Sequence, residues 1–224
     1  MQGELLDKWR ADLAAWAIPE HITAAVPDSP WVLPRQVFAR RADRLMAEPA
    51  GPSYEREREA LEPAGTVLDI GSGAGAACLP LAPPATSVTA VDTDAGMLTL
   101  LAERAAAAGL DSRTITGRWP DVADLVGPAD VVTCHHVVYN VPDIWDFLAA
   151  LTSYARRRVV VELTAVHPLT SLNPLWLRFH GLRRPDGSIL CALRSGLPRP
   201  GSPVDPPRWA RPAAATRGIA ARAG

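Results

Sequence analysis

The sequence has little of what would indicate a disulfide-stabilised, metal-binding or membrane-spanning protein. Its three cysteines, Cys78, Cys134 and Cys191, are too few and too scattered for a disulfide framework or a paired-cysteine metal site, so we expect no metal. No apolar run reaches the roughly 18 residues that a membrane span requires. Glu4 and Asp7 stand where a secretion signal would be basic and then apolar. We therefore expect a cytoplasmic protein that has no membrane partner.

Basic charge is also scarce over most of the chain. Residues 1–177 hold 14 lysines and arginines against 22 acids, and Lys8 is the sole lysine. Phosphate binding needs clustered cations, so an acidic body argues against nucleic acid as the partner and favours a small molecule. Residues 178–224 reverse the balance, with nine cations against two acids. A length of 224 residues suits one domain with appendages.

The most informative stretch is residues 66–75, which read TVLDIGSGAG. Residues 67–70 form a short apolar run, typical of a strand that is covered on both faces. We predict that Gly71 takes the positive φ of a turn, Gly73 lets the backbone approach a ligand, and Gly75 lets the next helix pack close to the strand. The first turn of that helix would direct its free N–H groups at the ligand.

The glycine spacing does not by itself separate two classes of cofactor. Gly71, Gly73 and Ala76 also satisfy the relaxed dinucleotide fingerprint G-x-G-x-x-G/A. Asp69 discriminates, because a carboxylate two residues before the first glycine would repel a pyrophosphate but suits an ammonium or sulfonium group. With its acid-x-G-x-G-x-G motif, the chain resembles the class I S-adenosylmethionine-dependent methyltransferases over roughly residues 60–165.

The resemblance implies an α/β fold, a Rossmann-like parallel sheet of order 3-2-1-4-5 with helices on both faces. Residues 1–62 would form an N-terminal helical cap, and residues 63–186 the cofactor-binding domain. Periodicity predicts strands over 66–70, 87–91, 112–116, 129–134 and 159–163. It predicts helices over 3–18, 19–26, 34–48, 53–61, 74–81, 94–109, 143–154 and 173–180. Three arginines, 156–158, would complement the dipole at the end of the helix 143–154.

The resemblance also assigns S-adenosylmethionine to the carboxyl ends of the strands. Asp69 would hold the methionine ammonium group. Asp92, about 20 residues beyond the first glycine, would accept both ribose hydroxyls, while Asp94 would cap the next helix. The implied cofactor-binding residues are Asp69, Gly71, Ser72, Gly73, Gly75, Asp92, Thr93, Met97, Trp119 and His135.

The loop after the third strand departs from the family's pattern. Many members carry a Gly-Asp pair here, whereas this chain has Arg118 and Trp119. Adenine could stack on Trp119, because an aromatic face accepts any base. Alternatively, Asp121 caps the following helix and Trp119 has another role. Both interpretations stay open from the sequence.

Polar residues follow the fourth strand, at the edge where parallel sheets bind ligands. His135 and His136 would point to opposite faces if the strand continued that far. An oxygen or nitrogen acceptor needs to lose a proton, and we take His135, His136 and Tyr139 as candidate catalytic bases. Glu162 and His167, near the end of the fifth strand, are further candidates for facing the acceptor.

We assign acceptor binding to Trp31, Arg35, Tyr139 and Asn140. Tyr54 is a further candidate, since helices before the first strand often shape the acceptor site in the family. The competing interpretation is that Trp31 only packs and that Arg35 is a solvated cation.

The family's sheet has two more strands, and the sequence supplies no pattern for them. Residues 187–224 hold six prolines, six arginines and one acid, and no strand-like alternation. A disordered basic arm, a proline-rich linker and an out-of-frame translation of GC-rich DNA all fit this composition. We favour the last, because the pattern is lost where strands 6 and 7 should lie. Translating the parent gene in its other frames tests it.

The sequence thus predicts an S-adenosylmethionine-dependent methyltransferase with an unidentified small-molecule acceptor. Two alternatives stay open. One is an NAD(P)-dependent oxidoreductase, which would share Gly71, Gly73 and Asp92, and the other is a non-catalytic domain that binds S-adenosylmethionine.

Overall fold

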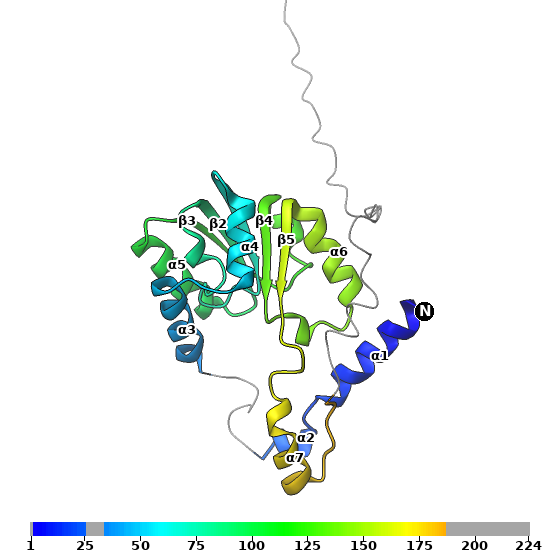
Figure 1. Cartoon of the computed structure of the whole chain (residues 1–224). Coiled ribbons are helices and arrows are strands. Elements are labelled where there is room, and N and C mark those ends of the chain that lie inside the picture. Colours follow the sequence, from blue (N-terminus) through cyan, green and yellow to red (C-terminus); the bar gives the residue numbers. More distant parts are fainter. Residues whose placement is uncertain (1, 26–33, 187–224) are drawn as a thin grey trace, which may run out of the picture.

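A computed structural model describes residues 2–25 and 34–186 (Figure 1). Its centre is a sheet of five parallel strands in the order β3-β2-β1-β4-β5. The strands are β1 (Gly65–Ile70), β2 (Ala85–Asp92), β3 (Asp111–Thr116), β4 (Ala129–His135) and β5 (Ala155–Glu162). The predicted α/β architecture and strand order are confirmed, and the strand ends differ from the predicted ones by a few residues.

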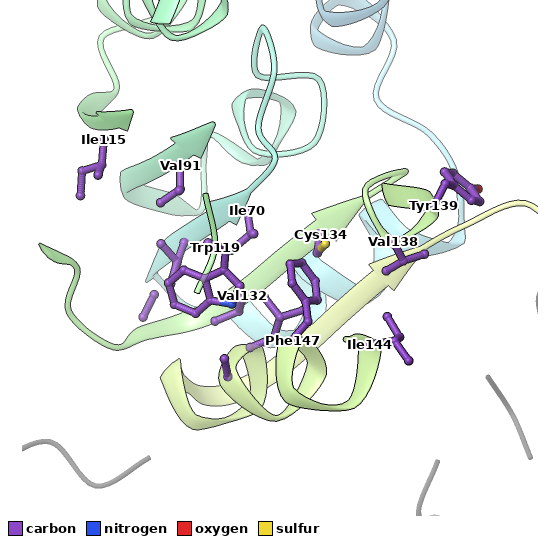
Figure 2. Close-up of a cluster of buried hydrophobic side chains, with 14 of the residues drawn as sticks. Ile70, Val91, Ile115, Trp119, Val132, Cys134, Val138, Tyr139, Ile144 and Phe147 are labelled. Atoms are coloured by element: carbon purple, nitrogen blue, oxygen red, sulfur yellow. The ribbon is translucent and has the colours of Figure 1, made fainter. Parts of the chain in front are cut away.

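One face of the sheet packs against α6 (Ile144–Tyr154) and, through Trp9, against α1 (Gln2–Ala15). Side chains alternate along a strand, so Leu68 of β1 and Val132 of β4 join this cluster while their neighbours face away. Figure 2 shows Trp119 beside Val132 in the cluster, with Tyr139 at its far side. The cluster therefore buries the loops that follow β3 and β4 as well as the strands.

The opposite face packs against α4 (Pro52–Leu61), α5 (Ala95–Ala107) and the 3-10 helix η1 (Leu79–Leu81). Val67, Leu61 and Leu101 are almost fully buried between these elements. Figure 1 shows α4 lying in front of the sheet. Helices therefore cover both faces, and the ligand edge is left at the carboxyl ends of the strands.

The remaining helices are α2 (Glu20–Thr23), α3 (Arg35–Ala47) and α7 (Asn173–His180), and three further 3-10 turns span Ala123–Leu125, Val138–Asn140 and Thr170–Leu172. Figure 1 shows α2 and α7 beyond the carboxyl ends of β4 and β5. The apolar residues of α3 are only partly buried, because Val37 is 49% and Phe38 is 37% exposed while Ala42 is buried. Phe38 instead borders a cavity described below. The boundary of the cap at residue 62 stays a prediction.

The predicted helix over residues 74–81 is wrong. Turns occupy residues 73–78, and η1 follows for three residues. Gly71, Gly73 and Gly75 all have positive φ, and Pro80 cannot donate a backbone hydrogen bond, so no α-helical run is established. The expected helix N-terminus behind the glycines is therefore absent from this part of the described chain.

The three arginines at 156–158 follow the end of α6, as predicted, but they are residues of a strand. Strand β5 begins at Ala155, immediately after α6, so the arginines belong to the strand. Arg157 lies 3.2 Å from Asp130, and Arg158 lies 2.8 Å from Glu59 on α4. These contacts attach α4 and the start of β4 to the edge of the sheet.

Within the described residues, β5 pairs with β4 alone. Trp31 and the Pro- and Arg-rich residues 187–224 lie outside the described residues, and so do the positions expected for strands 6 and 7. No helix in the described ranges combines the length and the apolar character needed to cross a bilayer.

Candidate functional site

The glycine turn has the backbone conformation predicted for it. Gly71, Gly73 and Gly75 have φ values of 70°, 51° and 91°. A Cβ on Gly71 would overlap the side chain of Val137, whereas a Cβ on Gly73 would meet nothing within 4 Å. Gly71 therefore permits a close approach of the β4 loop, and the space beside Gly73 is open to a ligand.

Two cavities adjoin at the carboxyl ends of the strands, with volumes of about 600 Å³ and about 350 Å³. They share four lining residues, Gly71, Asp92, His136 and Val137. The larger cavity extends over the loops after β3 and β4, and the smaller one extends over the glycine turn toward α3. Volumes of this size are typical of small-molecule sites.

Asp92 lies where the two cavities meet. Its Oδ2 accepts a hydrogen bond from the Gly73 amide at 2.8 Å, and its Oδ1 accepts one from the Asp94 amide at 2.9 Å. Each carboxylate oxygen keeps a second acceptor position. Asp94 accepts from the amides of Gly96 and Met97 at the start of α5, so its predicted role as a helix cap is confirmed.

Asp69 lies beneath the glycine turn and lines neither cavity. It pairs in register with Thr133, so its side chain shares a sheet face with Thr133 and His135. Only 1% of its surface is exposed. Burial raises the pKa of Asp69 to about 7, against the opposing effects of a hydrogen bond from the Cys78 thiol and of the charge of His135. Asp69 therefore borders neither cavity, and its contact with an ammonium group stays a prediction.

The two histidines end β4 in a way that the alternation rule does not describe. His136 has a φ of 60°, so the extended backbone stops at His135. Both rings consequently lie near one carboxylate, Glu162 at the end of β5, and both line the smaller cavity. The expectation that they point to opposite faces fails because its condition, a continuing strand, is not met.

His136 lines both cavities and has two partners at one nitrogen. Its Nε2 lies 2.8 Å from Oε1 of Glu162 and 2.8 Å from Nη2 of Arg41 on α3. The hydrogen bond with His136 lowers the pKa of Glu162 to about 2, helped by the Ser53 hydroxyl and the two imidazoles. Glu162 is therefore a carboxylate at neutral pH.

His135 is held from two sides. Its Nε2 lies 2.8 Å from Oε1 of Glu57 on α4, and its Nδ1 lies 3.7 Å from Oε2 of Glu162. Burial of the ring opposes protonation, but the hydrogen bond with Glu57 and the charges of Glu57, Asp69 and Glu162 prevail and raise the pKa of His135. This environment favours an imidazolium that is engaged at both nitrogens.

Three other predicted cofactor or acceptor residues border the larger cavity, namely Thr93, Trp119 and Asn140, while Met97 borders the smaller one. Trp119 is only 5% exposed and meets Tyr154 edge to face, with ring centroids 5.1 Å apart. Its ring therefore belongs to the core and also closes one side of the cavity. Asp121 makes no side-chain cap to the 3-10 turn that follows.

Tyr139 and His167 lie away from both cavities. The Tyr139 hydroxyl is 2.9 Å from Oγ1 of Thr164, and its ring is 8% exposed. His167 stacks on Trp16 of the N-terminal segment, with ring centroids 3.8 Å apart. Burial lowers the pKa of His167 to about 4, with a contribution from the charge of Arg184. His167 therefore connects the N-terminal segment to the chain that follows β5, and Tyr139 meets the same imidazole edge to face, with ring centroids 5.6 Å apart.

Arg35 also lies outside the lining of the cavities. Its guanidinium donates two hydrogen bonds to Asp94, at 2.9 and 2.8 Å, and passes close over Gly96. The pair attaches α3 to the start of α5, so Arg35 is not simply a solvated cation. Tyr54 borders a small separate cavity of about 70 Å³.

Sequence reasoning missed two residues that the structure brings to the histidines. Glu57 is 1% exposed on α4, and Arg41 reaches His136 from α3. A signal for Glu57 was present in the helical spacing, because Ser53, Glu57 and the buried Leu61 stand four residues apart on one face. No corresponding signal marked Arg41 among the four arginines of α3.

The chain is similar to known methyltransferases. Residues 67–157 match the profile of a family described as a methyltransferase domain. No curated protein matches the chain. Magnesium protoporphyrin IX methyltransferase from Synechocystis PCC 6803, solved with bound SAH, is 20% identical with a TM-score of 0.51, and the alignment covers 87% of this chain and 85% of that one.

A second solved structure is an S-adenosylmethionine-dependent methyltransferase from Thiobacillus denitrificans in complex with S-adenosylhomocysteine. It is 22% identical with a TM-score of 0.43, and the alignment covers 58% of this chain and 55% of that one. The family match spans most of β1, all of β2, β3 and β4, and the start of β5. It includes both Asp69 and the glycine turn. Residues 67–157 therefore match a methyltransferase domain, and the sheet has the fold of the solved methyltransferase structure.

Proposed function

We propose that this methyltransferase acts on an oxygen or nitrogen atom of a small molecule and that His136 removes the proton of that atom. One observation carries the proposal: the His136 ring borders both cavities while its Nε2 meets a carboxylate that is ionised at neutral pH. In the usual arrangement of a histidine base, a carboxylate orients the ring through one nitrogen while the other nitrogen takes up the proton.

The residues around the glycine turn suit S-adenosylmethionine. Asp92 has acceptor positions left for the two ribose hydroxyls, and the open space beside Gly73 admits a ligand next to the backbone. Gly71 and Ser72 complete this wall of the site, whereas Gly75 borders neither cavity and lies against Leu79 and Leu101. The bound cofactor supplies a methyl group that its sulfonium has already activated. The protein's own part is to hold and orient the acceptor.

Asp69 would act on the cofactor through the turn. Its carboxylate is buried directly beneath the loop that carries Gly71. A positive charge held above the turn favours the ionised form of a buried acid, and the ionised acid favours the positive charge. The preference for a sulfonium or ammonium ligand over a pyrophosphate follows from this electrostatic coupling.

His136 is better placed than His135 or Tyr139 to act as the base. When Nε2 of His136 donates to Glu162, Nδ1 keeps its lone pair and can accept a proton. Both nitrogens of His135 face carboxylates, and the Tyr139 hydroxyl is engaged by Thr164 away from the cavities. We therefore withdraw His135 and Tyr139 as bases and keep Asn140 as an acceptor-binding residue.

The size of the cavities supports a small-molecule acceptor. About 600 and 350 Å³ accommodate a cofactor together with a compact substrate. The acidic body of the chain does not favour nucleic acid, and the small number of cysteines supports a cytoplasmic setting.

Calorimetric titration of the purified chain separates the cofactor classes. We expect S-adenosylhomocysteine to bind and NAD to give no heat of binding, because Asp69 disfavours a pyrophosphate over the turn. Binding of NAD without binding of S-adenosylhomocysteine would overturn the cofactor assignment.

Transfer of a labelled methyl group to the small-molecule fraction of a cell extract tests catalysis. We expect His136→Asn to lower this transfer by a factor of about 10² to 10⁴. Its affinity for S-adenosylhomocysteine should change less than about threefold. The matched control is Glu55→Gln, at an exposed position of α4. Wild-type binding without transfer to any acceptor would instead indicate a non-catalytic binding domain.

A further inference from the structure

Four side chains form a continuous row from the interior to the cavities. Glu57 Oε1 lies 2.8 Å from His135 Nε2, His135 Nδ1 lies 3.7 Å from Glu162 Oε2, and Glu162 Oε1 lies 2.8 Å from His136 Nε2. Carboxylates and imidazoles alternate along the row. They come from α4, from the end of β4, from the end of β5 and from the residue after β4. Each oxygen of Glu162 faces a different ring.

We propose that Glu57 and His135 are positioning residues that act through Glu162 to fix the tautomer of His136. The proposal rests on the proposed function in one respect, since it takes His136 as the base. Neither Glu57 nor His135 would touch the reacting atoms. Their effect would be on which nitrogen of His136 carries the proton.

Competition at one nitrogen makes such control necessary. Nε2 of His136 faces an acceptor, Glu162, and a donor, Arg41, each at 2.8 Å. If Nε2 carries the proton it donates to Glu162, and Nδ1 is free to act as a base. If Nδ1 carries the proton, Nε2 accepts from Arg41 and Nδ1 can no longer take a proton from the acceptor. The position of Glu162 decides between the two forms.

His135 keeps Glu162 from turning toward Arg41. Arg41 lies 3.5 Å from Oε1 of Glu162, so it competes for the same carboxylate. The imidazolium of His135 attracts the other oxygen, Oε2, and thus opposes rotation of the carboxylate away from His136. A hydrogen bond with the Ser53 hydroxyl on α4 also lowers the pKa of Glu162.

Glu57 in turn keeps His135 charged. Its carboxylate is 1% exposed, and burial of an ionised group is costly unless a partner compensates for it. Glu57 and Leu61 lie on the same buried face of α4, and an apolar residue at position 57 would pack there without that cost. The hydrogen bond to His135 is the contact that accounts for a carboxylate there.

The experiment is ¹⁵N NMR of the histidine rings in the full chain, with and without S-adenosylhomocysteine. In the wild type we expect the His136 ring to show the shifts of the tautomer protonated at Nε2. In Glu57→Gln we expect a population of at least about one third protonated at Nδ1, and Glu57→Asp should restore most of the wild-type pattern. The control Glu55→Gln removes the same charge from an exposed position of the same helix and should change nothing.

The outcomes are separable. The proposal would be overturned if the Glu57→Gln variant folds and its His135 shifts move while its His136 shifts stay unchanged. If Glu57→Gln does not fold, His135→Gln gives the same test, because it removes the positive charge next to Glu162 and keeps the size of the side chain similar. The NMR measurement does not require methyl transfer, so it tests the positioning role independently. Absence of cofactor binding or of methyl transfer would overturn the proposed function, and the NMR result would still decide whether Glu57 and His135 position His136.

Discussion

The two sides of the ligand edge are built in different ways. The β1–β2 side uses a short stretch, from Gly71 to Ala77, together with Asp92, and the glycines in it offer a ligand only backbone. The β4–β5 side uses side chains that are more than a hundred residues apart, from Glu57 to Glu162. Binding of a common cofactor can thus depend on local sequence, whereas the chemistry of an individual acceptor depends on contacts that only the fold assembles.

This difference predicts separable effects. Changes on the β1–β2 side should lower affinity for S-adenosylhomocysteine, because the turn and Asp92 are where a nucleoside would lie. Changes on the β4–β5 side should alter proton transfer and leave that affinity nearly unchanged. The predictions below test this separation, starting from the largest expected effect.

Gly71→Ala should have the largest effect, on binding and stability together. The substitution forces alanine into a left-handed conformation, which costs about 1–2 kcal/mol, and its Cβ would also overlap Val137. We expect Tm to fall by roughly 5 °C or more and affinity for S-adenosylhomocysteine to fall at least about 100-fold. Differential scanning calorimetry and ligand titration measure both quantities.

Two other glycines separate the causes of that effect. Gly109 has a similar φ of 67° but open surroundings. Gly109→Ala should therefore lose stability through backbone strain alone and keep its affinity for S-adenosylhomocysteine. Gly73→Ala also has open space, and there we expect a loss of affinity larger than its loss of stability. Equal losses of affinity in all three variants would contradict the assignment of the turn to the ligand.

Asp92→Asn should lower the affinity for S-adenosylhomocysteine by a factor of about 10 to 100, the usual range for losing hydrogen bonds to a charged group. The asparagine keeps one acceptor oxygen but replaces the other with a donor that faces a backbone N–H. Titration calorimetry checks the value. An unchanged affinity would mean that the ribose is held elsewhere.

Asp69→Asn should show opposite effects on stability and on binding. The folded pKa of about 7 lies above the ordinary value of 3.8, so the stabilising contribution of the protonated acid is complete below about pH 3.8 and is lost as the pH rises through 7. The Tm of the variant should therefore exceed that of the wild type only slightly at pH 5 and by a few degrees at pH 8. Its affinity for S-adenosylhomocysteine should fall. Melting curves at a series of pH values test this, and a gain in Tm that does not vary with pH would contradict it.

Arg35→Ala should have the smallest effect. Its ion pair with Asp94 is exposed, and such pairs contribute little. We expect Tm to fall by less than about 3 °C and affinity for S-adenosylhomocysteine to change less than about twofold. A marked rise in the KM of an identified acceptor would restore Arg35 as an acceptor-binding residue, contrary to its position outside the cavities.

The sequence predicted the β1–β2 side well because the constraints there are local. Residues 67–70 must alternate between two buried faces, and the left-handed positions at Gly71, Gly73 and Gly75 admit few other residues. The position of Asp92 follows from the length of one strand–turn–strand unit. Periodicity likewise predicted α5 with its Asp94 cap, and α7.

Tertiary contacts decided what periodicity could not. Turns replace the helix predicted over 74–81, and α6 leads directly into β5, which places Arg157 beside Asp130. For Trp119 the sequence left open whether adenine stacks on it, and in the fold its ring lies mostly in the core while it borders the larger cavity. Arg157 and Trp119 contact neighbours that are distant in sequence, whereas the helix predicted over 74–81 is broken by the glycines and Pro80 of the stretch itself.

By itself, then, the sequence determined the sheet and the glycine turn, because strand alternation, positive φ and short spacings are properties of adjacent residues. Only the tertiary structure decided which histidine borders both cavities and which is held by Glu57. A left-handed His136 and a buried carboxylate on α4 depend on packing between β4, β5 and α4, and no short-range pattern encodes contacts over such a separation.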